Sequence, residues 1–287
     1  MTISEVIFLA IFWTWLFSAI LFLRNTFLPR LPVIQPDPVG LSFEQVDFHS
    51  TDGVSLKGWV IPHLPTSLWV ILCHGLGTNR SDLLDIATSL HEAGFNLFLF
   101  DFRGHGESAG ATSSFGWKEQ RDLEGALVYL GQHQAISRPC GVYGISMGAA
   151  VAIMVAARDE RIGAVAVESP YPNLEETLGR HLVMMYPLPK QPFLWFVAFT
   201  YKIRFGVWPG DVAPEESVNR LDPRPILLIQ GAEDKRMPLE GTKRIYEKAG
   251  GSKQLWVIEG AGHLESFSQN PVVYMERLIH FFRSSLN

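Results

Sequence analysis

Three short segments that lie far apart in the chain carry the side chains needed for nucleophilic catalysis. Ser146 lies in the pattern Gly-Ile-Ser-Met-Gly, Asp234 follows an apolar run, and His263 follows a glycine-rich turn. A serine hydroxyl is a poor nucleophile near neutral pH unless a base takes its proton and a carboxylate orients that base. The sequence therefore predicts Ser146 as the nucleophile, Asp234 as the acid and His263 as the base.

The residues around Ser146 fit a sharp turn between a strand and a helix. Val142 and Tyr143 form the end of an apolar run, and the small residues at 148–152 suit a helix. Glycine at position 144 leaves room where a Cβ atom would clash, and N–H groups at a helix start point toward developing negative charge. An ordinary Gly-Ser turn is the alternative, and the strand-turn-helix context favours the nucleophile.

Other residues could fill the roles of acid and base. Glu233 is the neighbour of Asp234, and Glu168 ends the preceding predicted strand, but the order nucleophile, acid, base favours Asp234. His263 could be a surface histidine in a flexible loop. It is the last histidine at a strand end, and histidine titrates near neutral pH, so the base is the favoured interpretation. His181 could contact the substrate.

An oxyanion hole needs two backbone N–H groups that point at one position. The residue after the nucleophile, Met147, is expected to supply one of them. Leu76, in the segment His-Gly-Leu-Gly at 74–77, is expected to supply the other. A tight connection without a binding role is the alternative for this segment.

Short apolar runs that alternate with helical patterns must position these residues. Strands are expected at about 43–48, 56–61, 68–73, 96–100, 141–143, 162–167, 225–230 and 254–258, the first two as a hairpin. Helices are expected at about 81–93, 117–132, 149–158, 239–249 and 271–285. This alternation predicts an α/β fold with a parallel sheet and right-handed crossovers, whose carboxyl ends collect the functional loops.

Residues 171–220 interrupt the alternation with an unusually apolar stretch, which we call the cap. It is either additional core or a cover over the active site, and we favour the cover because ligand pockets are lined mainly by apolar side chains. A second membrane span is not expected, since Lys190 and Lys202 bracket only 11 residues. The cap residues expected to bind substrate are Met184, Phe193, Trp195 and Phe196.

The amino-terminal segment is long and apolar enough to cross a bilayer. Residues 6–23 form an uncharged run of 18 residues. A cleaved signal peptide is the alternative, but Glu5 stands where a basic residue is usual, and no small-residue cleavage pattern follows. We therefore expect a transmembrane anchor at 1–23, and Arg24 and Arg30 favour a cytoplasmic catalytic domain. A proline-rich linker at 24–41 would join the anchor to a catalytic domain at 42–287.

The composition of the chain argues against several classes of partner and bound group. The net charge of −5 and the lack of a dense basic run argue against binding to nucleic acid. Two cysteines are too few for a disulfide framework, and no Cys/His cluster has the spacing of a zinc site, so no metal is expected.

Over residues 42–285 the chain resembles the α/β-hydrolase superfamily. The resemblance rests on the loops that carry Asp234 and His263 and on three segments, His-Gly-Leu-Gly at 74–77, Asp-Phe-Arg-Gly-His-Gly-Glu-Ser at 101–108 and Gly-Ile-Ser-Met-Gly at 144–148. Within the superfamily the chain looks like the monoacylglycerol-lipase, lysophospholipase and Bem46-like esterase branches. It departs from the lipase branches at Ile145, where they often carry histidine.

The resemblance implies an eight-stranded, mostly parallel sheet with a cap inserted after strand six. It also implies hydrolysis of esters or thioesters without a cofactor, and a structural role for the loop 101–108, so that His105 has no catalytic role. Together with the anchor and the apolar cap, it suggests a small-molecule acyl ester that is lipid-like or carries a medium-to-long acyl chain. A peptidase or amidase that acts on small amides is the alternative. A catalytically dead, membrane-tethered binding protein is disfavoured because all three catalytic residue types are present.

Overall fold

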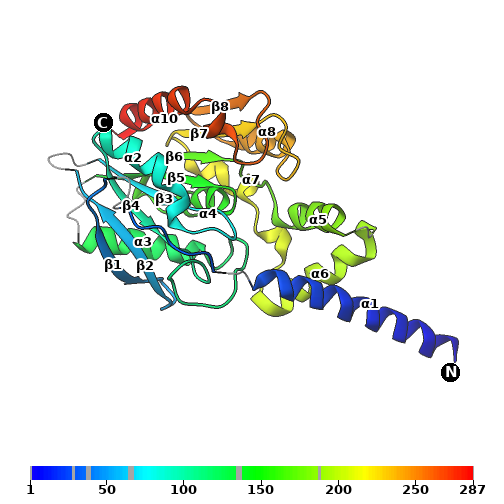
Figure 1. Ribbon diagram of the computed structural model, residues 1–287. Helices are drawn as coiled ribbons and strands as arrows, with labels where there is room; N and C mark the ends of the chain where they lie inside the picture. The colour runs from blue at the N-terminus through cyan, green and yellow to red at the C-terminus, as the bar shows by residue number, and fades with distance from the viewer. Residues whose placement is uncertain are drawn as a thin grey trace.

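Eight strands form a single sheet at the centre of the molecule (Figure 1). The structure is a computed structural model that describes residues 2–27, 30–36, 40–63, 68–133, 138–186 and 189–286. The strands lie in the order β1-β2-β4-β3-β5-β6-β7-β8. Their bounds are Glu44–His49 (β1), Ser55–Ile61 (β2), Trp69–Cys73 (β3), Asn96–Phe100 (β4), Cys140–Ile145 (β5), Ile162–Glu168 (β6), Ile226–Gly231 (β7) and Lys253–Ile258 (β8).

The pairing of the strands confirms the expected mostly parallel sheet. Strand β2 is antiparallel to both β1 and β4, and every other pair is parallel. The central strands β3, β4 and β5 are buried along their whole length, because helices cover both faces of the sheet. Their continuous apolar runs are the pattern expected of parallel strands buried on both sides.

Helices from different parts of the chain cover the two faces. One face packs against α3 (Gln120–His133), α4 (Met147–Ala156) and α8 (Leu239–Lys248). The other packs against α2 (Leu84–Glu92) and α10 (Pro271–Leu286). Two short helices, the 3-10 helix η2 (Arg80–Leu83) and α9 (Ser266–Gln269), also lie outside the cap. Helix α4 is buried at every residue, which explains its small and apolar sequence.

The segment between β6 and β7 forms a helical layer beside the sheet (Figure 1). It contains α5 (Leu174–Met185), α6 (Lys190–Phe205) and α7 (Pro214–Ser217), with the 3-10 helices η3 (Pro209–Asp211) and η4 (Val218–Leu221). Helices α5 and α6 pack against each other to one side of the sheet, as the cap insertion after strand six was expected to do.

The amino-terminal helix α1 (Ile3–Thr26) projects away from the body at its amino end and packs on α6 at its other end (Figure 1). It is long and apolar enough to cross a membrane by length and composition. It extends three residues beyond the expected end of the anchor at residue 23. Ser18, Ala19, Phe22 and Thr26 are buried. The last part of α1 is therefore a packed element of the fold.

The part of the expected linker that the structure describes is held against the loop after β4 and against helix η2. Residues 30–36 contain neither helix nor strand. Arg30 donates hydrogen bonds to the carbonyl oxygens of Gly106 and Gly110, and the N–H of Ile34 donates to Ser81 Oγ at 2.9 Å. Pro29 and Pro38, two of the prolines of the expected linker, lie outside the described residues.

Candidate active site

Ser146 lies on the turn between β5 and α4, in a backbone conformation that non-glycine residues rarely adopt. Its φ is 50° and its ψ is −113°. A Cβ atom on Gly144 would lie 2.6 Å from the carbonyl oxygen of Gly148, and a Cβ atom on Gly148 would lie 2.3 Å from that of Cys73. Both positions therefore require glycine, because any side chain would force the turn apart.

The side chains of Ser146, His263 and Asp234 meet at the carboxyl ends of the strands. His263 Nδ1–H donates to Asp234 Oδ2 at 2.7 Å, and His263 Nε2 lies 3.2 Å from Ser146 Oγ. These distances suit transfer of a proton from the serine hydroxyl to the imidazole while the carboxylate holds the ring. The three residues singled out from the sequence are thus brought together by the fold.

The carboxyl group of Asp234 is held in the ionised form. Burial acts to raise its pKa, but the hydrogen bond and charge interaction with His263, together with the Met237 backbone N–H and the Ser169 side chain, lower the pKa below its usual value. The backbone N–H groups of Arg236 and Met237 donate to Asp234 Oδ1 at 2.9 and 2.8 Å. Oδ2 is left facing His263, with a further contact from the Gln230 side chain at 3.2 Å.

Glu168, the rival carboxylate, has partners of its own. Tyr274 donates its hydroxyl to Glu168 Oε2 at 2.8 Å, and Tyr143 lies within 3.4 Å of the same oxygen. The N–H of Ser266, three residues after His263, donates to Oε1 at 3.3 Å. Burial raises the pKa of the Glu168 carboxyl. Glu168 thus supports the segment that follows the histidine, and His263 has Asp234 as its hydrogen-bonded carboxylate.

Two buried histidines hold the loop at 74–77 in place. The N–H of Phe102 donates to His74 Nε2 at 3.0 Å, and the N–H of Gly77 donates to His105 Nε2 at 3.1 Å. The Nδ1 atom of each ring therefore carries the proton, and it lies 2.7 and 2.9 Å from a backbone carbonyl oxygen. Burial lowers the pKa of both rings, which keeps them neutral. Their nitrogens are engaged with the backbone, so both act as supports.

The loop at 74–77 lies directly against the nucleophile. A Cβ atom on Gly75 would lie 3.7 Å from Ser146 Cβ, and Leu76 borders the same cavity as Ser146 and Met147. Met147 is the first residue of α4, where a backbone N–H has no partner within its own helix. The two residues expected to form an oxyanion hole thus border the same cavity as Ser146.

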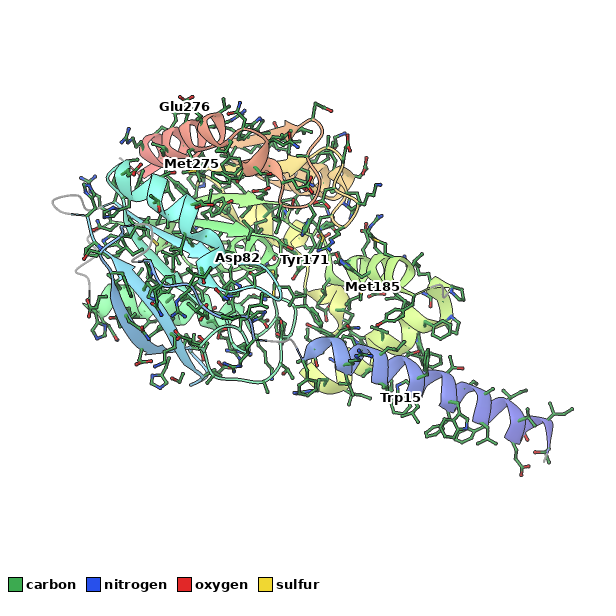
Figure 2. The ribbon with its side chains drawn as sticks, viewed as in Figure 1. Trp15, Asp82, Tyr171, Met185, Met275 and Glu276 are labelled. Atoms are coloured by element: carbon green, nitrogen blue, oxygen red, sulfur yellow. The ribbon has the colours of Figure 1, made fainter. Side chains whose placement is uncertain are left out.

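Ser146 and His263 open onto one cavity of about 370 Å³, which we call the catalytic cavity. Most of its walls are apolar and come from the cap, from the loop after β4 and from α1 (Figure 2 labels Tyr171 and Met185, two of the lining residues). Besides Ser146, His263, Gly75, Leu76 and Met147, the lining residues are Leu21, Phe22, Asn25, Thr78, Phe115, Tyr171, Leu174, Thr177, Leu178, His181, Leu182, Met185, Tyr186, Val197, Arg236, Met237 and Leu264.

The cap residues expected to bind substrate do not line this cavity, and that expectation needs correction. Trp195 is 58% exposed and Met184 is 51% exposed, while Phe196 is buried within the cap and Phe193 is half-buried. The reason is helical phase. Val197 faces the cavity, and Trp195, two residues earlier, lies about 200° away around α6. The lining residues of α5 follow an i, i+4, i+8 pattern that could have identified them.

Sequence reasoning also missed the contribution of α1. Leu21, Phe22 and Asn25 line the catalytic cavity, although the helix reads as an anchor. Phe22 packs its ring on those of Phe115 and Tyr201, at centroid distances of 6.0 and 5.9 Å. The available signal was a stripe of small side chains at 18, 19 and 26 in an otherwise bulky helix, because small residues allow close packing between helices.

Comparisons with known proteins agree with this architecture. Residues 70–277 match the family model described as the alpha/beta hydrolase family. The uncharacterized protein YqkD of Bacillus subtilis is 31% identical over 84% of this chain and 81% of its own length. The bem46 protein of Schizosaccharomyces pombe is 24% identical over 78% of this chain and 72% of its own length.

A solved structure provides the third comparison. The esterase Pf2001 of Pyrococcus furiosus superposes with a TM-score of 0.76 at 27% sequence identity. The superposition covers 91% of this chain and all of that chain.

Proposed function

Since the chain belongs to the alpha/beta hydrolase family, we propose that it is a serine hydrolase that cleaves carboxylic ester or thioester bonds of single-chain, lipid-like acyl substrates. The hydrogen-bonded series from Asp234 through His263 to Ser146, at the edge of an apolar cavity, is the observation that carries the proposal. An esterase among the similar structures supports it.

Acylation begins with attack on the substrate carbonyl. Ser146 Oγ bonds to the carbonyl carbon while its proton passes to His263 Nε2, and Asp234 stabilises the imidazolium that forms. The bond from the carbonyl carbon to the leaving oxygen or sulfur then breaks. His263 returns the proton to that leaving atom, and the acyl group stays on Ser146.

Deacylation repeats these steps with water as the nucleophile. His263 takes a proton from water, the resulting hydroxide attacks the acyl carbon, and the proton returns to Ser146 Oγ as the carboxylic acid departs. In both halves the backbone N–H groups of Leu76 and Met147 would stabilise the negatively charged oxygen. Loss of one such donor typically costs about 3–4 kcal/mol of transition-state stabilisation.

The size and lining of the catalytic cavity favour a substrate with one hydrocarbon chain. Its volume of about 370 Å³ is close to the lower end of the range for small-molecule pockets. Leucine, phenylalanine, methionine and valine side chains dominate the wall beyond the reacting groups. Transfer of each CH₂ group from water to such a wall contributes about 0.8 kcal/mol, so longer acyl chains are expected to bind more tightly until the cavity is filled.

We propose further that α1 stays on the mature protein as a membrane anchor. Its length and apolar composition meet the requirement for a span. Cleavage as a signal peptide would remove Leu21 and Phe22 from the wall of the catalytic cavity, which favours retention. Arg24 and Arg30 follow the apolar run, so the catalytic domain is expected on the cytoplasmic side.

The test of the catalytic proposal is the Ser146→Ala variant. It is expected to lose covalent labelling by a fluorophosphonate probe, and kcat for acyl esters should fall at least about 10³-fold, because the nucleophile is absent. Ser268→Ala is the matched control, since Ser268 is an exposed serine five residues after His263. Labelling of Ser146→Ala at the wild-type level would contradict the proposal.

A further inference from the structure

One wall of the catalytic cavity comes from the helix that is proposed to anchor the protein. Leu21, Phe22 and Asn25 of α1 border the same cavity as Ser146 and His263, although they precede Ser146 by more than 120 residues in the chain. In Figure 1 the carboxyl end of α1 lies beside the cap and next to the catalytic domain.

This part of α1 is fixed to the rest of the protein at several points. The ring of Phe22 is 4% exposed and packs between Phe115 and Tyr201. The N–H of Ser113 donates to the carbonyl oxygen of Thr26 at 3.0 Å. These contacts join α1 to both the catalytic domain and the cap, so the end of α1 is held in place as a wall of the cavity.

The chemistry of the wall suits a hydrocarbon chain. Leu21 and Phe22 are apolar, as are their cavity neighbours Leu178, Leu182 and Val197 on the cap. Burial of apolar ligand atoms against such a wall is favourable, whereas a polar ligand group would lose hydrogen bonds to water there without gaining new ones.

The one polar side chain that α1 adds to the wall is already engaged. Asn25 Nδ2 donates to the carbonyl oxygen of Leu21 at 2.9 Å and lies 3.4 Å from the hydroxyl of Tyr186. This amide therefore joins α1 to the end of α5, and the hydrocarbon-facing part of the α1 wall is left to Leu21 and Phe22.

We infer that Leu21 and Phe22 bind the part of the acyl chain that lies away from the ester, so that α1 sets chain-length selectivity as well as anchoring the protein. This inference rests on the proposed acyl-ester hydrolysis. The proposed substrate is an ester with a single acyl chain, taken from the membrane in which α1 is embedded. The chain would run from Ser146 past Phe115 to Leu21 and Phe22, all of which border the cavity.

Selectivity for chain length in two matched variants of the full-length protein tests the inference. Leu21→Trp places a larger side chain in the cavity, whereas Ile20→Trp changes the neighbouring residue, which is 57% exposed. The ratio of kcat/KM for a laurate ester to kcat/KM for a butyrate ester is expected to fall about tenfold or more in Leu21→Trp. Ile20→Trp should keep the wild-type ratio. An unchanged ratio in Leu21→Trp would overturn the inference.

A binding measurement separates this inference from the proposed catalysis. Lauric acid is expected to raise the melting temperature of the wild type and of Ile20→Trp in the same detergent, because it binds the folded state. Leu21→Trp should show little of this shift. A full shift in Leu21→Trp, or none in the wild type, would refute the role of α1 whatever the activity. Ester hydrolysis that persists in Ser146→Ala would instead refute the catalytic proposal.

Discussion

Two buried carboxylates lie near the ends of neighbouring strands, and their hydrogen-bond partners give them different roles. Glu168 is the last residue of β6, and Asp234 lies in the loop after β7. Asp234 receives two backbone N–H groups on one oxygen, which leaves the other oxygen for His263. Glu168 receives two tyrosine hydroxyls and the N–H of Ser266. The first arrangement orients an imidazole, whereas the second stabilises the segment on which that imidazole is mounted.

Amide substitutions should separate the two roles. In Asp234→Asn the carbonyl oxygen keeps the two backbone donors, so the amide NH₂ faces His263 Nδ1 and favours the tautomer with the proton on Nε2. That ring cannot accept the serine proton, and kcat is expected to fall by about 10³–10⁴-fold. Glu168→Gln should cost about 1–3 kcal/mol of unfolding free energy and leave kcat in the wild-type order of magnitude.

Steady-state kinetics and urea unfolding of both variants provide the measurement. The assignment of the acid would be wrong if Glu168→Gln lost activity to the same extent as Asp234→Asn while remaining folded.

The neutral histidines behind the loop at 74–77 predict a dependence of stability on pH. In the folded protein, burial lowers the pKa values of His74 and His105 below the ordinary value for histidine. In the unfolded chain, the pKa of each ring is about 6.5. Below that pH the unfolded state binds more protons, so the free energy of unfolding should decrease as the pH falls through 6.5.

Urea unfolding between pH 7.5 and 5.5 tests this expectation, with His105→Asn as the comparison. The variant should lose part of the slope because one of the two titrating rings is gone. An equal slope in both proteins would show that His105 does not contribute.

At the scale of the elements, the sheet and the order of the reacting residues could be predicted from the sequence, but the face of α6 that lines the cavity could not. Strands buried on both faces leave continuous apolar runs, and glycine is required at the serine turn, so both leave a local signal. Helix α6 is apolar on two sides, because one side packs on α1 and the other carries exposed residues such as Trp195 and Phe199. Local patterns do not distinguish those two sides.

The amino-terminal helix extends beyond its apolar run for a related reason. Hydropathy ends at Leu23, but the helix continues to Thr26 because its last turn packs on the cap and on residue 113. Tertiary contacts of this kind have no counterpart in a local hydropathy pattern.

Packing of α1 on the cap predicts unequal effects of two phenylalanine substitutions in one helix. Phe22→Ala should lower the free energy of unfolding by about 3 kcal/mol, the lower end of the usual range, because part of the ring already faces the cavity. Phe12→Ala should have little effect, since Phe12 is 39% exposed and lies on the projecting part of the helix. Thermal unfolding in detergent provides the measurement, and equal effects would indicate that the end of α1 is not docked.

At the scale of the whole molecule, the proposed anchor requires that the amino-terminal helix is retained. Mass spectrometry of the protein purified from membranes should find residues 2–27 intact, and alkaline carbonate should leave the protein in the membrane fraction, because a spanning helix is not released by salt or pH. A mature chain that begins after residue 23 would identify the helix as a signal peptide.

If α1 spans a bilayer as proposed, its docking would also limit the distance between the active site and that bilayer. Residues 2–13 are exposed, and at about 1.5 Å per residue the stretch from Ile3 to Trp13 covers only ~16 Å of a ~30 Å hydrocarbon core. A complete span must therefore use residues near Phe22, which are the ones fixed to the cap. In a protein anchored by α1 as proposed, Ser146 would therefore be held at a fixed depth relative to the headgroups, close to esters that lie at the lipid surface.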